Sequence, residues 1–103
     1  MTLITPELRK ITPLLYGNEG KDVKDMPITA KFFTPWSNWS WYMTELDEGD
    51  NIAFGFTAGL DSELGYFSIK ELEALQGPGG IKVERDLYFG RHSLSEVLYG
   101  ARP

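Results

Sequence analysis

The chain of 103 residues contains no cysteine, and this absence excludes disulfides, cysteine-based zinc sites, iron–sulfur clusters and thiol nucleophiles. It contains one histidine, His92, so a His-rich metal site or a two-histidine catalytic pair is also excluded. No apolar run is long enough to span a bilayer, and residues 1–7 lack the basic start and long apolar stretch of a signal peptide. We therefore expect a cytoplasmic protein with no membrane segment, no metal and no cofactor.

Basic residues are missing from the middle of the chain. No Lys or Arg occurs between Lys31 and Lys70, and six of the 15 acidic residues lie there: Glu45, Asp47, Glu48, Asp50, Asp61 and Glu63. Because the net charge is −5, the rest of the chain is nearly neutral at +1. Clustered Lys and Arg are what release counterions from a nucleic-acid backbone, so we expect no direct nucleic-acid partner.

The remaining composition is typical of one small globular domain. Hydrophobic residues make up 42% and charged residues 24%, both near the average for folded proteins. The length supports one core but not two, and no linker divides the chain. We expect residues 1–103 to form a single domain.

Local signals predict three helices. Thr5 and Pro6 begin the first, which Pro13 should end or kink, and apolar residues follow at helical spacing. That stripe is Leu8, Ile11, Leu14 and Leu15. Capping boxes at 68–71 and 93–96 begin two short helices, the first running through Gln76 and the second ending near Gly100.

Alternating apolar residues predict five strands, at residues 27–33, 40–46, 52–58, 64–67 and 81–89. The alternation places Ile28, Ala30 and Phe32 on one face of the first strand. It places Trp41 and Met43 opposite Tyr42, Thr44 and Leu46 in the second. In the third, Ile52, Phe54 and Phe56 face the core, and Ala53, Gly55 and Thr57 leave room for a helix or a partner. In the fifth, Arg85 interrupts the apolar face, which indicates an edge strand or a nearby carboxylate.

Short turns between the strands favour antiparallel pairing. We therefore expect the α+β class, with a mainly antiparallel sheet of about five strands, an N-terminal helix and two short capped helices packed on it.

Two groups of residues are candidates for partner binding. The first is the six acids of the cation-free segment, for which a polar turn is favoured over a metal site because the spacing matches no EF-hand loop. The second is aromatic: Trp36, Trp39 and Trp41 lie within six residues, and Tyr42 follows. Core packing is the favoured role for at least two of these tryptophans, and an exposed anchor beside the acidic turn is the functional alternative.

No catalytic motif is present. An enzyme would need carboxylates to converge with Arg85, Arg91 or His92, and the sequence alone shows no partner for His92, which we expect to make a local hydrogen bond in a loop. The glycine-rich residues 77–80 lack the Lys-Ser/Thr of a phosphate-binding loop and indicate a helix end and a turn.

Five ordered blocks make the chain resemble a bacterial family, the domain of unknown function 2958. They are LITPELR (3–9), KFFTP (31–35), TELD with IAFG (44–47, 52–55), ELGYFS (63–68) and VERDLYF (83–89). The resemblance implies an uncharacterised small protein of plasmids, conjugative elements or phages, with no known active site to carry over. By context it also suggests a role against host defence.

Together these observations predict a non-catalytic, acidic interaction protein of a mobile genetic element that counters host defence. Its partner would be a protein with a basic surface, such as a CRISPR or restriction complex, bound through Glu45, Asp47, Glu48, Asp50, Asp61 and Glu63 with Trp36, Trp39 and Tyr42. The turn before the third strand and the loop after it should lie at opposite strand ends, so the acids are expected to form two clusters. The alternatives are a small carboxylate-based or metal-dependent enzyme, and a housekeeping binding module whose pocket is lined by Trp36, Trp39 and Tyr42.

Overall fold

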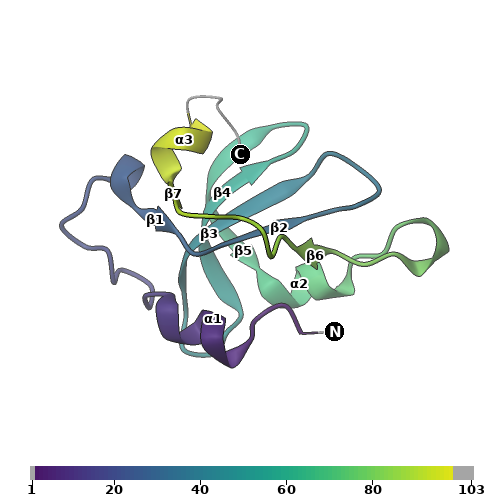
Figure 1. Ribbon diagram of the computed structural model, residues 1–103, viewed down its shortest axis with the longest axis horizontal. Helices are drawn as coiled ribbons and strands as arrows, with labels where there is room; N and C mark the ends of the chain where they lie inside the picture. The colour runs from purple at the N-terminus through teal and green to yellow at the C-terminus, as the bar shows by residue number, and fades with distance from the viewer. Residues whose placement is uncertain (1, 99–103) are drawn as a thin grey trace.

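A five-stranded antiparallel sheet in the order β5-β4-β3-β2-β6 forms the centre of the computed structural model, which describes residues 2–98 (Figure 1). Its strands are β2 (Ala30–Phe33), β3 (Ser40–Leu46), β4 (Ile52–Ala58), β5 (Ser62–Ser68) and β6 (Glu84–Arg85). The short strands β1 (Pro27–Ile28) and β7 (His92–Ser93) pair separately, also antiparallel. The helices are α1 (Pro6–Ile11), α2 (Ile69–Ala74) and α3 (Leu94–Leu98), with 3-10 turns η1 (Val23–Asp25) and η2 (Pro78–Gly80). This arrangement confirms the predicted α+β class.

Both faces of the sheet are covered, and each cover forms its own core. On the first face, Leu8 of α1 and Ile69 and Leu72 of α2 pack against Trp41 and Met43. On the second face, α3 contributes apolar side chains to a cluster around Tyr42 and Phe56. Among residues 2–98 no helix has the length and apolar character needed to cross a membrane.

The helix ends follow the predicted local signals. The Thr5 hydroxyl accepts a hydrogen bond from the N–H of Leu8, and that of Ser68 accepts one from the N–H of Glu71. At α3 the Glu96 carboxylate accepts from the N–H of Ser93, which is one half of a capping box. The expected end of this helix near Gly100 lies outside the described residues.

The predicted apolar stripe of the first helix is wrong in part. Helix α1 ends at Ile11, so Leu14 lies beyond the helix. The side chains of Ile11 and Leu14 are both largely exposed. Only Leu8 of the stripe is fully buried. Helix α2 is also shorter than predicted: it ends at Ala74 and not at Gln76, and Leu75 is exposed.

The predicted first strand divides at Thr29. Residues Pro27 and Ile28 pair with β7, whereas Ala30 to Phe33 pair with β3. Ile28 therefore joins the core around Tyr42, while Ala30 and Phe32 join the core around Trp41. The prediction that these three side chains share a face is wrong for Ile28, because the chain changes sheets between them.

A β-bulge changes which faces the residues of β3 occupy. Met43 pairs with Gly55 and Glu45 pairs with Phe54, so Thr44 is the extra residue. Beyond the bulge Leu46 lies with Trp41 and Met43, not with Tyr42 as predicted. The Thr44 hydroxyl donates to the carbonyl of Phe54 at 2.8 Å, which satisfies a backbone acceptor beside the irregular ladder.

The predicted fifth strand is reduced to the two residues of β6 and an isolated bridge between Lys82 and Gln76. The N–H of Asp86 makes a last hydrogen bond to the carbonyl of Lys31, and the Asp86 carboxylate then accepts from the N–H of Tyr88. This turn leads the chain away from the sheet, so Leu87 and Tyr88 are exposed, Tyr88 at 97%. The predicted edge position of Arg85 is confirmed, because β6 is the outermost strand on that side.

The paired glycines Gly55 and Gly65 should respond in opposite ways to the same substitution. A Cβ on Gly55 would overlap the carbonyl oxygen of Tyr42, whereas a Cβ on Gly65 has open space around it. We expect Gly55→Ala to lower the free energy of unfolding by about 3 kcal/mol and Gly65→Ala to change it by less than about 0.5 kcal/mol. Urea denaturation of both variants measures the difference, and equal effects would contradict the close backbone approach at the bulge.

Candidate functional site

The six acids of the cation-free segment are divided between the two ends of β4. Asp47, Glu48 and Asp50 lie in the turn before β4, and Asp61 lies in the turn after it. Seven residues of extended chain separate the two ends by about 20 Å. Glu63 is paired with Thr57 near the second end. The predicted separation into two groups is thus what the strand pairing produces, and the acids do not form one continuous surface.

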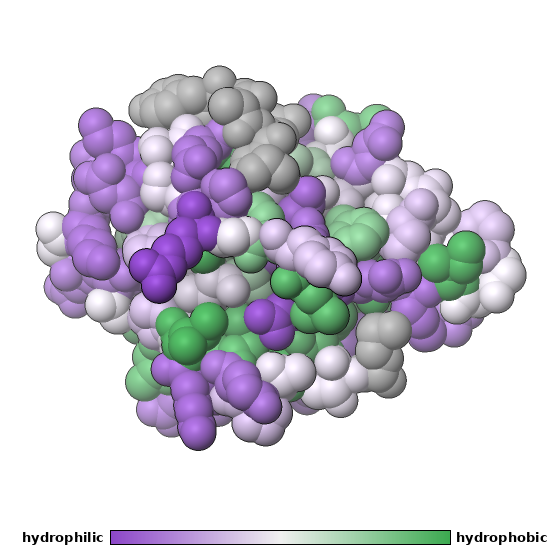
Figure 2. Space-filling model, in the orientation of Figure 1, coloured by the Kyte–Doolittle hydropathy of each residue, from purple (hydrophilic) through white to green (hydrophobic). Residues whose placement is uncertain are grey.

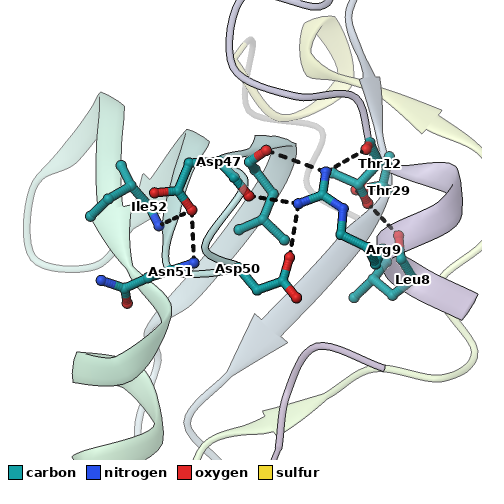
Figure 3. A network of polar contacts seen from close by, with 9 residues as sticks. Leu8, Arg9, Thr12, Thr29, Asp47, Asp50, Asn51 and Ile52 are labelled. Carbon is teal, nitrogen blue, oxygen red and sulfur yellow. Dashed lines mark hydrogen bonds and ion pairs between the residues drawn. The ribbon is translucent and has the colours of Figure 1, made fainter. Parts of the chain in front are cut away.

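Asp47 holds the turn between β3 and β4 in place. Its Oδ1 accepts hydrogen bonds from the N–H groups of Asn51 (2.9 Å) and Ile52 (3.0 Å) (Figure 3). The hydrogen bond from Asn51 is the main cause that lowers the pKa of Asp47 below its ordinary value of 3.8, against a smaller opposing effect of burial. This carboxylate is therefore engaged within the chain.

Arg9 closes the same turn from the other side. Its guanidinium donates to the carbonyls of Asp47 (2.7 Å) and Thr12 (2.8 Å), and at 3.3 Å to that of Leu46. It also pairs with the Asp50 carboxylate at 2.9 Å (Figure 3). Helix α1 and the acidic turn are joined by this one side chain, which neutralises part of the local negative charge.

Glu45 lies inside the protein. The bulge turns its side chain to the Tyr42 face of the sheet, where it is only 4% exposed. Its two oxygens accept hydrogen bonds from the N–H groups of Tyr16 and Asn18, each at 3.0 Å. Three of the six acids are thus held within the chain, Glu45 and Asp47 by backbone N–H groups and Asp50 by its ion pair with Arg9. The other three, Glu48, Asp61 and Glu63, are exposed.

The three tryptophans line one groove on the other face of the sheet. Trp36, Trp39 and Trp41 surround an open space of about 500 Å³ that is also bordered by Leu75 and Gln76. The rings of Trp39 and Trp41 stack with centroids 5.9 Å apart and an interplanar angle of 24°. Trp41 is buried, while Trp36 and Trp39 stay partly exposed, so they combine packing with an accessible surface.

Two glycines allow the indole rings to lie flat against the backbone. A Cβ on Gly59 would overlap the ring of Trp39, and one on Gly77 would overlap the ring of Trp36. Gly77 of the predicted glycine-rich helix end thus has a second role, because the absence of a Cβ leaves room for the ring of Trp36 at the groove.

A second hollow of about 450 Å³ continues the groove along α2. It shares Trp41 and Leu75 with the first and is lined in addition by Phe67 and Glu71. Trp41, Thr57 and Glu63 are direct cross-strand neighbours, so their side chains lie on the same face. One exposed acid from the predicted set therefore lies on the groove side of the sheet. We call these two hollows together the tryptophan groove.

Tyr42 lies elsewhere. It is 2% exposed on the opposite face, where its ring contacts those of Phe89 and Phe56 at centroid distances of 5.9 and 6.5 Å. The pocket predicted from Trp36, Trp39 and Tyr42 thus contains the two tryptophans without the tyrosine. Trp41 takes its place, because its ring stacks on that of Trp39.

Arg85, Arg91 and His92 line one hollow of about 470 Å³ beside β7. Strand β7 lies on the near side of the molecule in Figure 1, and Figure 2 shows that hydrophilic (purple) and hydrophobic (green) side chains alternate over this face. The predicted local hydrogen bond of His92 is confirmed, because its Nδ1 lies 3.0 Å from the Glu96 carboxylate, but His92 lies in strand β7 and not in a loop. This bond, with a second from the N–H of Ser93, lowers the pKa of Glu96. The residues that line the hollow include no carboxylate within the described part of the chain.

The comparisons with known proteins decide the family. A family model with the description "Protein of unknown function (DUF2958)" matches residues 3–103, essentially the whole chain. The chain belongs to the DUF2958 family. No curated protein and no solved structure matches it.

In this DUF2958 protein Asp47 should stabilise the fold only while it is ionised. Its lowered pKa means that the contribution is present above pH 3.8 and is lost as the pH falls through the lower folded-state value. We expect Asp47→Ala to cost about 1 kcal/mol at pH 7, like the loss of a helix cap. Urea unfolding of both proteins from pH 7 down to pH 2 tests this. A difference that stays constant over this range would contradict the ionised cap.

The carbonyl contacts of Arg9 should matter more to the DUF2958 fold than its ion pair. Arg9→Met leaves three carbonyls without this donor, and we expect a loss of about 2 to 3 kcal/mol in unfolding free energy. Asp50→Asn removes only an ion pair whose acidic side chain is 45% exposed, which should cost less than about 1 kcal/mol. Thermal unfolding of the two variants and of the unchanged protein at low and high salt measures both losses of stability. A larger loss for Asp50→Asn would show that the ion pair dominates.

Proposed function

We propose that this DUF2958 protein is a non-catalytic interaction protein whose main contact surface is the tryptophan groove. The observation that carries the proposal is the groove itself, where Trp36 and Trp39 remain partly exposed over a buried Trp41. Tryptophan is one of the residue types enriched among side chains that dominate binding energy at interfaces. The groove is concave and mostly apolar, with a few polar groups at its border, as binding surfaces usually are.

The charges around the groove select the kind of partner. Glu63 lies on its face through the pairing with Thr57, and Glu71 lines its extension along α2. Three strands of this face, β3, β4 and β5, lie in the segment without Lys or Arg. A partner segment with an apolar anchor and adjacent Lys or Arg residues complements both features, because the anchor fills the groove and the cations meet the acids.

The predicted role against host defence remains a prediction. The proposal agrees with it in requiring a basic protein surface, which CRISPR and restriction complexes present to nucleic acid. It differs in the residues that make the contact, since Glu45, Asp47 and Asp50 are engaged within the chain. In the present proposal Glu63 and the tryptophans contact the partner. Glu48 does not, because it lies in the turn at the other end of β4.

Binding of a basic partner should depend on Trp39 and Glu63 and not on Glu48. The assay captures host proteins with and without a defence complex, then measures direct binding of each purified candidate by calorimetry at two salt concentrations. We expect Trp39→Ala to weaken binding about 30-fold and Glu63→Lys about 5-fold, with a smaller salt dependence for the second variant.

Two variants are matched controls. Tyr88→Ala removes an aromatic side chain that is fully exposed away from the groove, and Glu48→Lys reverses a charge at the far end of β4. Both should bind like the unchanged protein. A partner that binds Trp39→Ala normally, or that loses affinity equally with Glu48→Lys, would contradict the groove as the contact surface.

A further inference from the structure

Three local irregularities meet around the buried carboxylate of Glu45. The first is the bulge at Thr44, which turns Glu45 to the Tyr42 face. The second is Tyr16, whose φ of 67° is in the left-handed region that a bulky residue rarely adopts. The third is Asn18, which is 4% exposed and whose side-chain Nδ2 has no hydrogen-bond partner. Such exceptions to ordinary backbone and hydrogen-bonding rules gather at functional sites.

These residues form a small pocket of about 160 Å³. Glu45 and Asn18 contribute its buried polar atoms, and the exposed rings of Tyr16 and Tyr66 and the ring of Phe54 form aromatic walls. The Tyr66 hydroxyl donates to that of Tyr16 at 3.3 Å, and Phe54 meets the Tyr66 ring edge-on at 5.2 Å. The space equals that of about five waters, enough for a charged group with a few attached heavy atoms.

Glu45 forms no ion pair among residues 2–98, although the charged side chains of Lys21 and Glu19 also line the pocket. Its oxygens accept two backbone N–H groups, and a carboxylate has room for about two further donors. The hydrogen bond to Tyr16 raises the pKa of Tyr66, and the negative charge of Glu45 adds to this rise. A buried, negatively charged group between aromatic rings attracts a cation, since the ring faces and the carboxylate both favour positive charge.

Asn18 adds a second requirement. Its buried Nδ2 is a donor without an acceptor, so an occupant of the pocket gains by presenting an oxygen acceptor beside its cation. We propose that the pocket binds an ammonium group with a neighbouring carbonyl, as in an amino-acid amide or the free N-terminal residue of a peptide. The ammonium donates to Glu45, and the carbonyl accepts from Asn18.

This site is separate from the tryptophan groove. Glu45 is the direct cross-strand neighbour of Phe54, on the Tyr42 face, whereas the groove lies on the Trp41 face. Binding at the pocket around Glu45 is measured with small amines and without any protein partner. The two proposals can therefore fail independently, one in a partner-binding assay and the other in a titration with small amines.

The test is an NMR titration of the full chain with leucinamide, N-acetyl-leucinamide and a tetrapeptide that begins with leucine. We expect leucinamide to shift the side-chain amide of Asn18 and the rings of Tyr16 and Tyr66 in a saturable way. Acetylation removes the positive charge and should abolish these shifts. A tetrapeptide that binds more tightly than leucinamide identifies a peptide N-terminus as the ligand, and one that binds less tightly identifies a free amino-acid derivative.

Variants decide whether the pocket is responsible. Glu45→Gln should weaken leucinamide binding about tenfold or more, because a charge-assisted hydrogen bond is lost. Tyr66→Ala, at an exposed position that does not endanger the fold, should weaken it about threefold through the lost ring. Glu48→Gln removes an acid outside the pocket and should bind normally. Equal binding of the acetylated compound, or unchanged affinity in Glu45→Gln and Tyr66→Ala, would overturn the proposal.

Discussion

Strand β3 runs through the middle of the sheet with both faces buried, and its hydrogen-bond ladder must accommodate one extra residue at Thr44. The bulge determines which core receives each side chain. Before it, Trp41 and Met43 alternate with Tyr42, and after it Leu46 and Glu45 exchange the faces that simple alternation assigns to them. The Thr44 hydroxyl and the missing side chain of Gly55 make this irregularity possible.

The two surfaces described above follow from this central strand. On one face, the stacked pair of Trp39 and Trp41 meets the side of α2 and leaves the tryptophan groove open. On the other, the carboxylate of Glu45 enters a mainly apolar layer and must obtain hydrogen bonds from the segment around Tyr16 and Asn18. Burial of a charge without such bonds costs several kcal/mol, so this segment and the bulge depend on each other.

The acidic segment is therefore not a uniform negative surface. Asp47 and Asp50 hold a tight turn to which Arg9 ties the first helix, and Glu45 is enclosed. A single binding surface made of all six acids would have required them to face solvent together. Strand pairing instead separates the exposed ones by the length of β4, and only Glu63 lies on the face of the tryptophan groove.

Features that depend on neighbouring residues along the chain were predictable from the sequence. The hydroxyl caps at Thr5 and Ser68, the stop at Pro13, three of the five strands and the family membership all rest on local patterns. The clustering of the tryptophans in the sequence also predicted a pocket that contains Trp36 and Trp39. The positions of Tyr42 and Glu45 were not, because a one-residue bulge changes the face of every side chain beyond it.

The short length of β6 and the pocket around Glu45 were likewise decided by the tertiary structure. The contacts of Glu45 join residues 29 and 27 positions apart, and Arg9 reaches carbonyls almost 40 positions away. Local propensity has no information about such pairs. The sequence by itself determined the class of fold, the helix starts and the charge of each segment. Only the tertiary structure decided which acids are buried, which tryptophans are accessible and where a pocket forms, because these depend on strand register and on contacts between distant parts of the chain.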